Sequence, residues 1–339
     1  MATLLQTASF AALKASLSDF PQMDETAMQA ARERQLQLTK PPGSLGMLEE
    51  LAVFLAGWQG QEKPVIDRAQ ALIFAGNHGV CAQGVNPFPQ EVTAQMVANF
   101  QHGGAAINQL CAANGCDLSV IALDLDRPTG DISQGPAMDE AETLDAMRQG
   151  AEAVDPQAQL LVLGEMGIGN STIAAALACA VFGGRGADWA GPGTGADSEG
   201  VSLKARVVDQ ALEANRSAIS DPLATLAALG GREQAAICGA ILEARRRRIV
   251  VVLDGFICSA AAAVLHPFAG ALDHSIAGHV SAEPGHQRLL EAMGKKPLLS
   301  LGMRLGEGSG AALAVSVLRS AVACHNGMAT FAEAGVAGG

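Results

Sequence analysis

The sequence has few charged residues and no excess of positive charge. Asp, Glu, Lys and Arg make up 17% of its 339 residues and hydrophobic residues 49%, which argues against disorder and allows a large core. Acidic residues outnumber basic ones 34 to 22, giving a net charge of −12. We therefore expect neither nucleic acid nor a membrane surface as a partner. A phosphorylated substrate would need a local cation to balance its charge.

Paired cysteines and long apolar runs are also lacking. The seven cysteines are scattered and none forms a Cys-x-x-Cys pair, so we expect reduced, mostly buried thiols. No basic segment precedes the first apolar residues, and we expect no signal peptide. The longest apolar run, FICSAAAAVL at 256–265, is too short to cross a bilayer. These features together predict a soluble, cytoplasmic protein.

The motifs of metal sites and of serine hydrolases are missing as well. His78, His266, His274, His279 and His286 are irregularly spaced, and no His-x-x-x-His with a nearby acid occurs. No Gly-x-Ser-x-Gly motif is present either. We therefore expect no bound metal and no Ser–His–Asp triad.

Short apolar runs alternate with helical patterns through the middle of the chain. The runs AQALIFAG, LSVIAL, QLLVLG and RIVVVLDG each end at glycine or polar residues, as buried parallel strands do. They predict an α/β fold with a Rossmann-like parallel sheet and helices on both faces. Residues 1–66 and 305–339 have helical patterns, one of them with Ser44 as a candidate N-cap, and are expected to form a small lobe beside a large α/β domain, 67–304. The run RRRR at 245–248 is expected to be a solvated surface rather than a basic binding patch.

Ligands of doubly wound sheets bind beyond the carboxyl ends of the strands, which selects the residues that follow three of these runs. Asn77-His78-Gly79 follows the first run, Glu165 follows the third, and Phe256 lies just after the fourth. A carboxylate at the carboxyl end of a strand commonly faces a ligand, which makes Glu165 a candidate site residue.

Two glycine-rich segments are candidate anion sites. GEMGIGNST, 164–172, is either a phosphate loop or a plain strand-to-helix turn capped by Ser171 or Asn170. GPGTGADSEGVSLKARVV, 191–208, contains Lys204, which is either the local cation for a phosphate or an ordinary exposed lysine.

One carboxylate lies within a third glycine-rich run. RLGEGSGAAL, 304–313, places Glu307 between Gly306 and Gly308 at the start of a helical pattern. Either Glu307 faces solvent in a loop, or the glycines let a substrate approach the backbone with the carboxylate directed at it.

Seven segments in order resemble one enzyme family. KPPGSLGMLEELA, FAGNHGV, PQEVTAQMV, LGEMGIGNST, VLDGF, GHVSAEPG and RLGEGSGAAL are similar to the nicotinate-nucleotide–dimethylbenzimidazole phosphoribosyltransferases, from about residue 35 to about residue 335. The resemblance implies transfer of the phosphoribosyl group of nicotinate mononucleotide to 5,6-dimethylbenzimidazole, without a cofactor, by a homodimer. Alternatives are the same transfer to a phenol or purine, or a nucleotide-binding module without turnover.

The resemblance also implies roles for particular residues. Glu307 corresponds to the catalytic base, and glycines such as Gly306 leave room for a flat ring and a ribose. Glu165 corresponds to the carboxylate beside the ribose. The remaining expected substrate-binding residues are Gly167, Lys204 and Ser281 at the phosphate, Phe88, Gln95 and Met96 near the acceptor base, and His78 after the first strand. Phe88 and Met96 depart from the family, which has Ser and Gln at these positions, so we expect a more apolar acceptor pocket.

The chemistry implied by the resemblance needs a single proton acceptor. The pyridinium base of the donor leaves as a neutral ring, while the attacking benzimidazole must lose its N–H proton as the new bond forms. One carboxylate is sufficient as general base. We expect the N-terminal end of the following helix to help keep Glu307 ionised.

Overall fold

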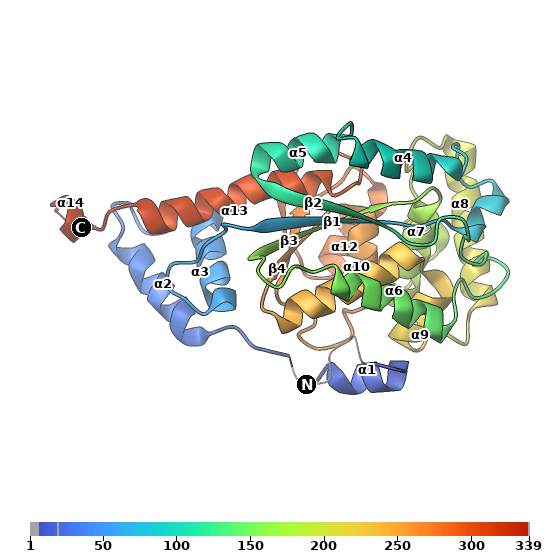
Figure 1. Ribbon diagram of the computed structural model, residues 1–339, viewed down its shortest axis with the longest axis horizontal. Coiled ribbons are helices and arrows are strands. Elements are labelled where there is room, and N and C mark those ends of the chain that lie inside the picture. Colours follow the sequence, from blue (N-terminus) through green and yellow to red (C-terminus); the bar gives the residue numbers. More distant parts are fainter. Residues whose placement is uncertain (1–6, 19, 338–339) are drawn as a thin grey trace.

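The computed structural model describes residues 7–18 and 20–337, and within them one sheet forms the centre of the fold (Figure 1). Its strands are all parallel and lie in the order β2-β1-β3-β4-β5-β6. The predicted α/β class is confirmed. The strands are β1 (Ala69–Ala75), β2 (Cys116–Ala122), β3 (Leu160–Met166), β4 (Val250–Leu253), β5 (Ser275–His279) and β6 (Pro297–Leu299).

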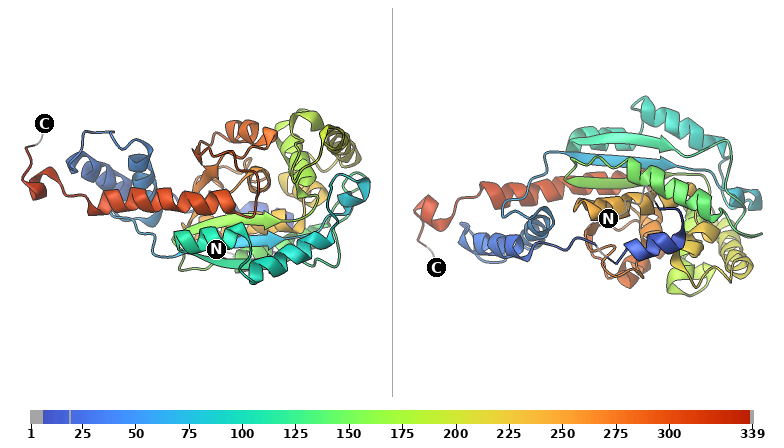
Figure 2. Two further views of the ribbon diagram at one scale, coloured as in Figure 1. Left: turned by 90° about the horizontal axis from the view of Figure 1, so that it is seen from above. Right: turned by 60° about the horizontal axis from the view of Figure 1, so that its bottom comes forward.

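Helices cover both faces of the sheet, as Figure 2 shows from two further directions. The helices are α1 (Phe10–Ser16), α2 (Glu25–Gln37), α3 (Met47–Gln59), α4 (Glu91–Gln101), α5 (Ala106–Asn114), α6 (Glu140–Glu152), α7 (Asn170–Phe182), α8 (Ser198–Ala214), α9 (Pro222–Leu229), α10 (Arg232–Arg246), α11 (Phe256–Ala263), α12 (Pro284–Ala292), α13 (Ser309–Gly327) and α14 (Phe331–Ala334), with short 3₁₀ turns η2 (Gly79–Gln83) and η3 (Gly186–Asp188).

The central strands are apolar on both faces because each face has its own core. In β1, Leu72 and Phe74 belong to the core beneath α6, α7, α10 and α11, whereas Ala71 and Ile73 belong to the core beneath α3, α5 and α13. Successive side chains of a strand point to opposite faces, so a strand buried on both sides has a continuous apolar run. This is why the apolar runs of β1, β3 and β4 were recognisable as strands.

Helices from both parts of the expected small lobe meet at one end of the molecule. Helices α2 and α3 pack together, α3 packs on α13, and Leu38 forms an antiparallel bridge with Thr330 (Figure 1). The guanidinium of Arg34 in α2 donates to the carbonyl of His325 at the end of α13, at 2.8 Å. The proposed division into 1–66 with 305–339 and 67–304 agrees with this packing for α2 and α3 and stays a proposal.

The first helix, however, lies with the large α/β body. Leu13 and Leu17 join the core that contains Leu223, and Lys14 pairs with Asp221 at the start of α9. The apolar face of α1 is therefore buried away from α2 and α3.

Three local expectations were wrong. The helix α3 begins at Met47 after Gly46, without a cap from Ser44. The helix α7 begins after Gly169 without a side-chain cap. The expectation of a solvated RRRR run holds for the exposed Arg247 and Arg248 but is wrong for Arg245, which is fully buried. Its guanidinium lies over the ring of Trp58 at 4.4 Å and donates to the carbonyl of Gly270 at 2.8 Å.

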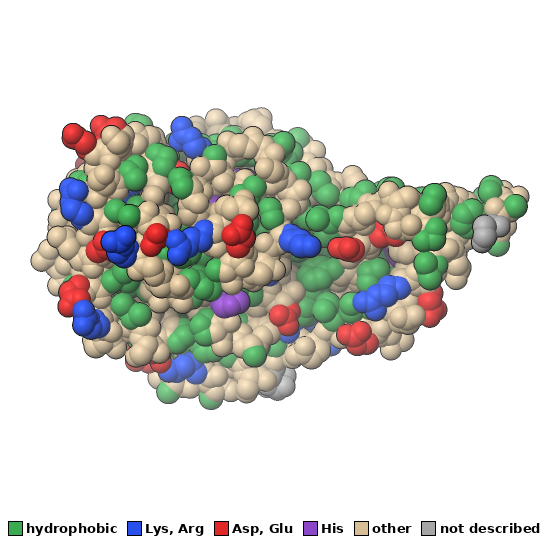
Figure 3. All heavy atoms as spheres, turned by 180° about the vertical axis from the view of Figure 1, so that it is seen from behind, with side chains coloured by type: hydrophobic (Ala, Val, Ile, Leu, Met, Phe, Trp, Pro, Cys, Tyr) green, Lys and Arg blue, Asp and Glu red, His purple; other side chains and the backbone are tan. Residues whose placement is uncertain are grey.

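Charges of both signs are mixed over the surface. On the face shown in Figure 3, basic and acidic side chains alternate with apolar ones over the broad body and the tapering end. No helix of the described residues is long and apolar enough to cross a membrane.

Candidate active site

A cavity of about 790 Å³, part of it open to solvent, lies at the carboxyl ends of β3, β4 and β5. Five segments that are far apart in sequence line it: 165–171, 193–194 with Lys204, 255–257, 279–283 and 304–307. Ligand sites of parallel sheets lie at this edge. Of the predicted site residues, six line the cavity: Glu165, Gly167, Lys204, Ser281, Gly306 and Glu307.

Glu307 combines burial, a free oxygen and an unusual backbone. It is 6% exposed, and its Oε2 is buried with no hydrogen-bond partner in the protein. Its φ of 62° lies in the left-handed region, where a residue with a side chain is strained. Burial, and next the charge of Asp254, raises the pKa of Glu307 to about 7. The prediction that Glu307 is a solvated loop residue is thereby excluded.

The helix that follows Glu307 is capped by another carboxylate. Asp254, directly after β4, is fully buried and accepts hydrogen bonds from the backbone N–H groups of Gly308, at 3.2 Å, and Ala311, at 3.0 Å. The N-terminal end of α13 therefore stabilises the charge of Asp254. The expected stabilisation of ionised Glu307 is outweighed by burial and by this neighbouring negative charge.

Glu165 lies at the end of β3, beside the loop of Glu307. Its Oε2 accepts a hydrogen bond from the amide of Asn170 in the first turn of α7. Burial is the main cause that raises the pKa of Glu165 to about 8, and the charges of Asp254, Glu233 and Glu307 add to it. At neutral pH Glu165 therefore holds its proton more firmly than Glu307 does.

Position 306 requires glycine because the loop that holds Glu307 lies against the side chain of Glu165. The φ of Gly306 is 83°, and a Cβ added to it would lie 2.7 Å from Oε1 of Glu165. Any side chain would thus displace Glu165 as well as strain the backbone. The glycine brings the main chain of the Glu307 loop against the end of β3.

Lys204 is buried in α8 and directed at the glycine-rich segment before that helix. It is 3% exposed, and its Nζ donates to Ser171 Oγ at 3.1 Å and to the Gly191 and Pro192 carbonyls at 3.3 and 3.4 Å. Burial lowers the pKa of Lys204. Of the two interpretations, the exposed lysine is excluded, and the ammonium lies beside the N-terminal end of α7, an anion-binding arrangement.

Several other residues line the cavity, and no role was predicted for them from the sequence. Arg304 lines the cavity and donates to the Gly193 carbonyl at 3.0 Å, and Asn86, His279 and Glu283 line it as well. His279 Nε2 lies 3.4 Å from Asp254 Oδ1. His279, Glu283 and Arg304 lie within GHVSAEPG and RLGEGSGAAL, two segments of the resemblance, whereas Asn86 lies in none of the seven segments.

Phe88, Gln95 and Met96 do not line this cavity. Phe88 is 45% exposed, and Met96 of α4 packs against the core on the α13 side of the sheet. Two contacts link this region to the site: Asn86 lines the cavity, and Thr93 Oγ1 accepts a hydrogen bond from the Ile168 N–H at 3.1 Å.

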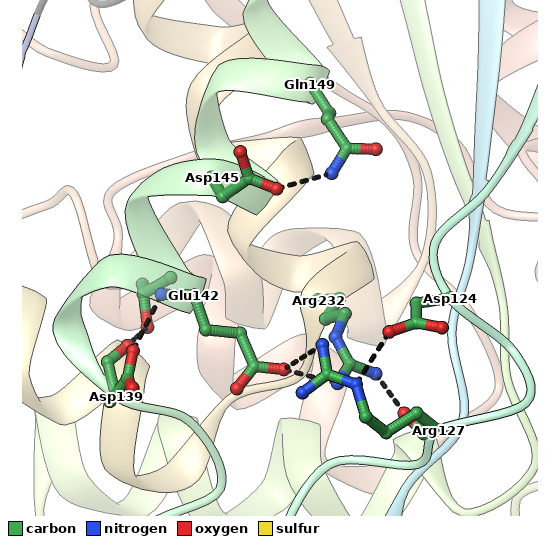
Figure 4. A network of polar contacts seen from close by, with 8 residues as sticks. Asp124, Arg127, Asp139, Glu142, Asp145, Gln149 and Arg232 are labelled. Atoms are coloured by element: carbon green, nitrogen blue, oxygen red, sulfur yellow. Dashed lines mark hydrogen bonds and ion pairs between the residues drawn. The ribbon is translucent and has the colours of Figure 1, made fainter.

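His78 is buried behind the cavity. Its Nε2 lies 2.6 Å from Glu233 Oε1, and both side chains are fully buried. The neighbouring Arg232 holds the start of α10 to α6 through Glu142 and to the Arg127 carbonyl (Figure 4). His78 therefore supports the wall near Gly167, since a Cβ on that glycine would lie 3.0 Å from His78 Nε2.

Several known proteins are similar to this chain over nearly its whole length. A family described as "Phosphoribosyltransferase" matches residues 20–336. The nicotinate-nucleotide–dimethylbenzimidazole phosphoribosyltransferase of Jannaschia sp. (strain CCS1) is 61% identical over 317 residues, 93% of this chain and 94% of that protein. That of Rhodobacter capsulatus is 59% identical over 334 residues, 98% and 99% of the two chains.

A solved structure has the same fold. The crystal structure of the enzyme of that name from Thermus thermophilus superposes with a TM-score of 0.86 at 42% identity, covering 94% of this chain and 100% of that one. At this level of similarity the parallel sheet and its covering helices are shared.

Proposed function

We propose that this chain, which belongs to the nicotinate-nucleotide–dimethylbenzimidazole phosphoribosyltransferase family, transfers the 5-phosphoribosyl group of nicotinate mononucleotide to 5,6-dimethylbenzimidazole. The products are α-ribazole 5′-phosphate and nicotinate, for the lower nucleotide of cobalamin. The observation that carries the proposal is the unpartnered, buried carboxylate of Glu307 in a cavity that also holds a buried lysine.

The donor lies, in this proposal, across the carboxyl ends of β3 and β5. Lys204, Ser281 and the backbone near Gly167 hold the 5′-phosphate at the N-terminal end of α7. Glu165, which keeps its proton at neutral pH, donates a hydrogen bond to a ribose hydroxyl. The phosphate thereby gains the local cation that the acidic composition lacks.

Glu307 acts as the general base. The bond between C1′ and the pyridinium nitrogen breaks, and its electron pair neutralises the departing nicotinate ring. The free nitrogen of the benzimidazole forms the new bond to C1′ from the opposite face, which inverts the sugar from β to α. The proton on the other ring nitrogen passes to Glu307, whose pKa of about 7 suits proton transfer at neutral pH.

In this proposal the acceptor reaches from Glu307 to the segment of Phe88, Gln95 and Met96, which does not line the cavity itself but is linked to it through Asn86 and Thr93. Apolar contacts from Phe88 and Met96 recognise shape, and the N–H bonded to Glu307 supplies the one directional contact. A methyl group more or less in such a pocket changes transition-state binding by about 1–3 kcal/mol. We expect benzimidazole and its methylated forms to be accepted.

Incubation with nicotinate mononucleotide and a panel of aromatic bases, followed by mass spectrometry, tests the activity. The expected product is α-ribazole 5′-phosphate from 5,6-dimethylbenzimidazole. Higher kcat/KM with a phenol or with adenine would favour the alternative acceptor classes. Absence of product with every base, together with tight nucleotide binding, would leave only a nucleotide-binding module.

The assembly is proposed to be a homodimer in the cytoplasm. Several large apolar side chains are exposed, among them Leu36, Met47, Leu301 and Leu305, and burial of such groups favours self-association. Sedimentation velocity of the purified protein would show a species of twice the chain mass, and fractionation of cells would test the location.

A further inference from the structure

The proposed phosphate subsite contains a carboxylate as well as cations. Glu283, the residue before α12, lines the cavity together with Lys204, Ser281 and Arg304. A phosphomonoester carries nearly two negative charges at neutral pH. Binding it beside an ionised Glu283 would place like charges together, which is unfavourable in a partly buried site.

Glu283 is held in this position by its surroundings. Its backbone N–H donates to Ser281 Oγ at 3.3 Å, and its Oε1 is buried without a hydrogen-bond partner. A Cβ added to Gly191 would overlap Oε2, so the carboxylate rests on the backbone of that glycine. The carbonyl of the same Gly191 accepts a hydrogen bond from Lys204, which places the carboxylate close to the ammonium group.

The groups that face Glu283 include Lys204, which is expected to bind the phosphate. Burial raises the pKa of Glu283 above its ordinary value, and Lys204 of α8, the Gly193 N–H and Arg304 offset only part of that rise. On its own helix, the pKa of buried His286 is lowered to about 3, so that ring is neutral. Arg288 of α12 lies 3.3 Å from Asp188 instead. Without a ligand, Glu283 therefore depends on the lysine and the arginine for its negative charge.

A phosphate that engages these cations removes the stabilisation and adds a like charge. We propose that Glu283 takes up a proton from solvent when a 5′-phosphomonoester binds, and then donates a hydrogen bond to a phosphate oxygen. No bond to phosphorus changes in this step. The inference depends on the proposed function only in placing the phosphate of the donor beside Lys204.

Proton uptake is measurable by calorimetry without the acceptor base. Binding of nicotinate mononucleotide and of ribose 5-phosphate is followed between about pH 7.5 and 9 in phosphate-free buffers of different ionisation enthalpy. Because ribose 5-phosphate lacks the pyridinium, its binding does not involve titration of Glu165 or Glu307 against that cation. The expected result for the wild type is uptake of about one proton, with Kd rising about tenfold per pH unit.

The variant Glu283→Gln keeps the shape and cannot titrate. Its proton uptake should be about one lower than that of the wild type with both ligands, and its Kd should change little with pH. Glu199→Gln, an exposed change on α8, is the control and should behave as the wild type. Equal proton uptake in the wild type and in Glu283→Gln would overturn the inference. It would mean that Lys204, not Glu283, takes up the proton.

If Glu283→Gln does not fold, the wild type still decides, because a Kd independent of pH for ribose 5-phosphate contradicts proton uptake. The proposed function is judged separately by product formation. A wild type that forms no riboside product with any base would refute the transferase, whereas formation of product with no proton uptake would refute only the role of Glu283.

Discussion

At the scale of single residues, Glu307 is held in a conformation that its own chemistry disfavours. A left-handed backbone in a residue with a side chain costs about 1–3 kcal/mol and persists where the surroundings determine it. Here Asp254 fixes the next turn through the N–H groups of Gly308 and Ala311. The cap by Asp254 therefore helps hold Glu307 in this conformation, in which it lines the cavity.

Glu307→Gln should keep this geometry and remove the proton acceptor. We expect kcat to fall by about 10²–10⁴-fold, the usual contribution of a general base, with little change in the Kd of nicotinate mononucleotide. Steady-state kinetics and calorimetry measure the two quantities. Glu50→Gln, an exposed change on α3, is the control. Near-normal turnover in Glu307→Gln would mean that another group or water accepts the proton.

The pH dependence of turnover follows from the same carboxylate. A base acts only when unprotonated, so kcat should rise through a pKa of about 7 and level off above it. Asp254→Asn removes a neighbouring negative charge, and the rising limb should then move to lower pH. The measurement is kcat against pH with both substrates saturating. A limb at the same pH in both proteins would show that another group titrates.

At the scale of elements, α4 supports the loop after β3. The hydroxyl of Thr93 is fully buried and accepts the Ile168 N–H at 3.1 Å. Thr93→Val keeps the shape but leaves that N–H unpaired, at a cost of about 1–3 kcal/mol. We expect KM for the nucleotide to rise several-fold, while Thr93→Ser retains the hydroxyl and the affinity. Unchanged KM in Thr93→Val would mean that the loop is held by other contacts.

Elements were predictable from sequence where burial gave them a uniform pattern. The strands β1, β3 and β4 have such patterns and were expected, and β2, partly exposed at the edge of the sheet, was expected from its apolar run alone. In contrast, β5 has Ser275 and His279 within five residues, and β6 has three residues, too few for a periodic signal. The residue pattern could not show that Arg245, within a basic run, is buried over Trp58, because that depends on packing between α3 and α10.

The site was predictable in part for a related reason. Glu165, Lys204 and Glu307 stand out as charged residues among glycines or after a strand, and the structure brings them into one cavity. Asp254 also follows a strand, but its role as the cap of α13 needs the fold, because 54 positions separate it from Gly308. Glu283 could not be distinguished from an ordinary helix-start acid without knowing that it faces Lys204.

At the scale of the whole molecule, Arg245 joins the segment before α2 to the large body. Its guanidinium donates to the carbonyls of Pro21 and Gly270 and lies 5.2 Å from the Phe20 ring centroid. Arg245→Ala should lower the free energy of unfolding by about 2–5 kcal/mol through lost packing and unpaired carbonyls. Urea denaturation measures this, and the exposed Arg206→Ala is the control.

Turnover per folded molecule should be unchanged in Arg245→Ala, because the residue lies at the amino-terminal side of the sheet, opposite the cavity. A variant as stable as the wild type would show that the contacts of Arg245 are replaced by water without cost. A fall in kcat at full folding would instead mean that the chain ends influence the site.

The long helix α13 constrains how the protein can be recombined with its relatives. Its first turns pack on β3 and β5 next to Glu307. Its later turns pack against α3, and the carbonyl of His325 near its end accepts a hydrogen bond from Arg34. A chimaera that exchanges only the region before β1 would set foreign helices against the native α13. A chimaera therefore needs two crossover points, one near residue 67 and one within α13 after Val315. The helices before β1 and the second part of α13 then come from the same parent.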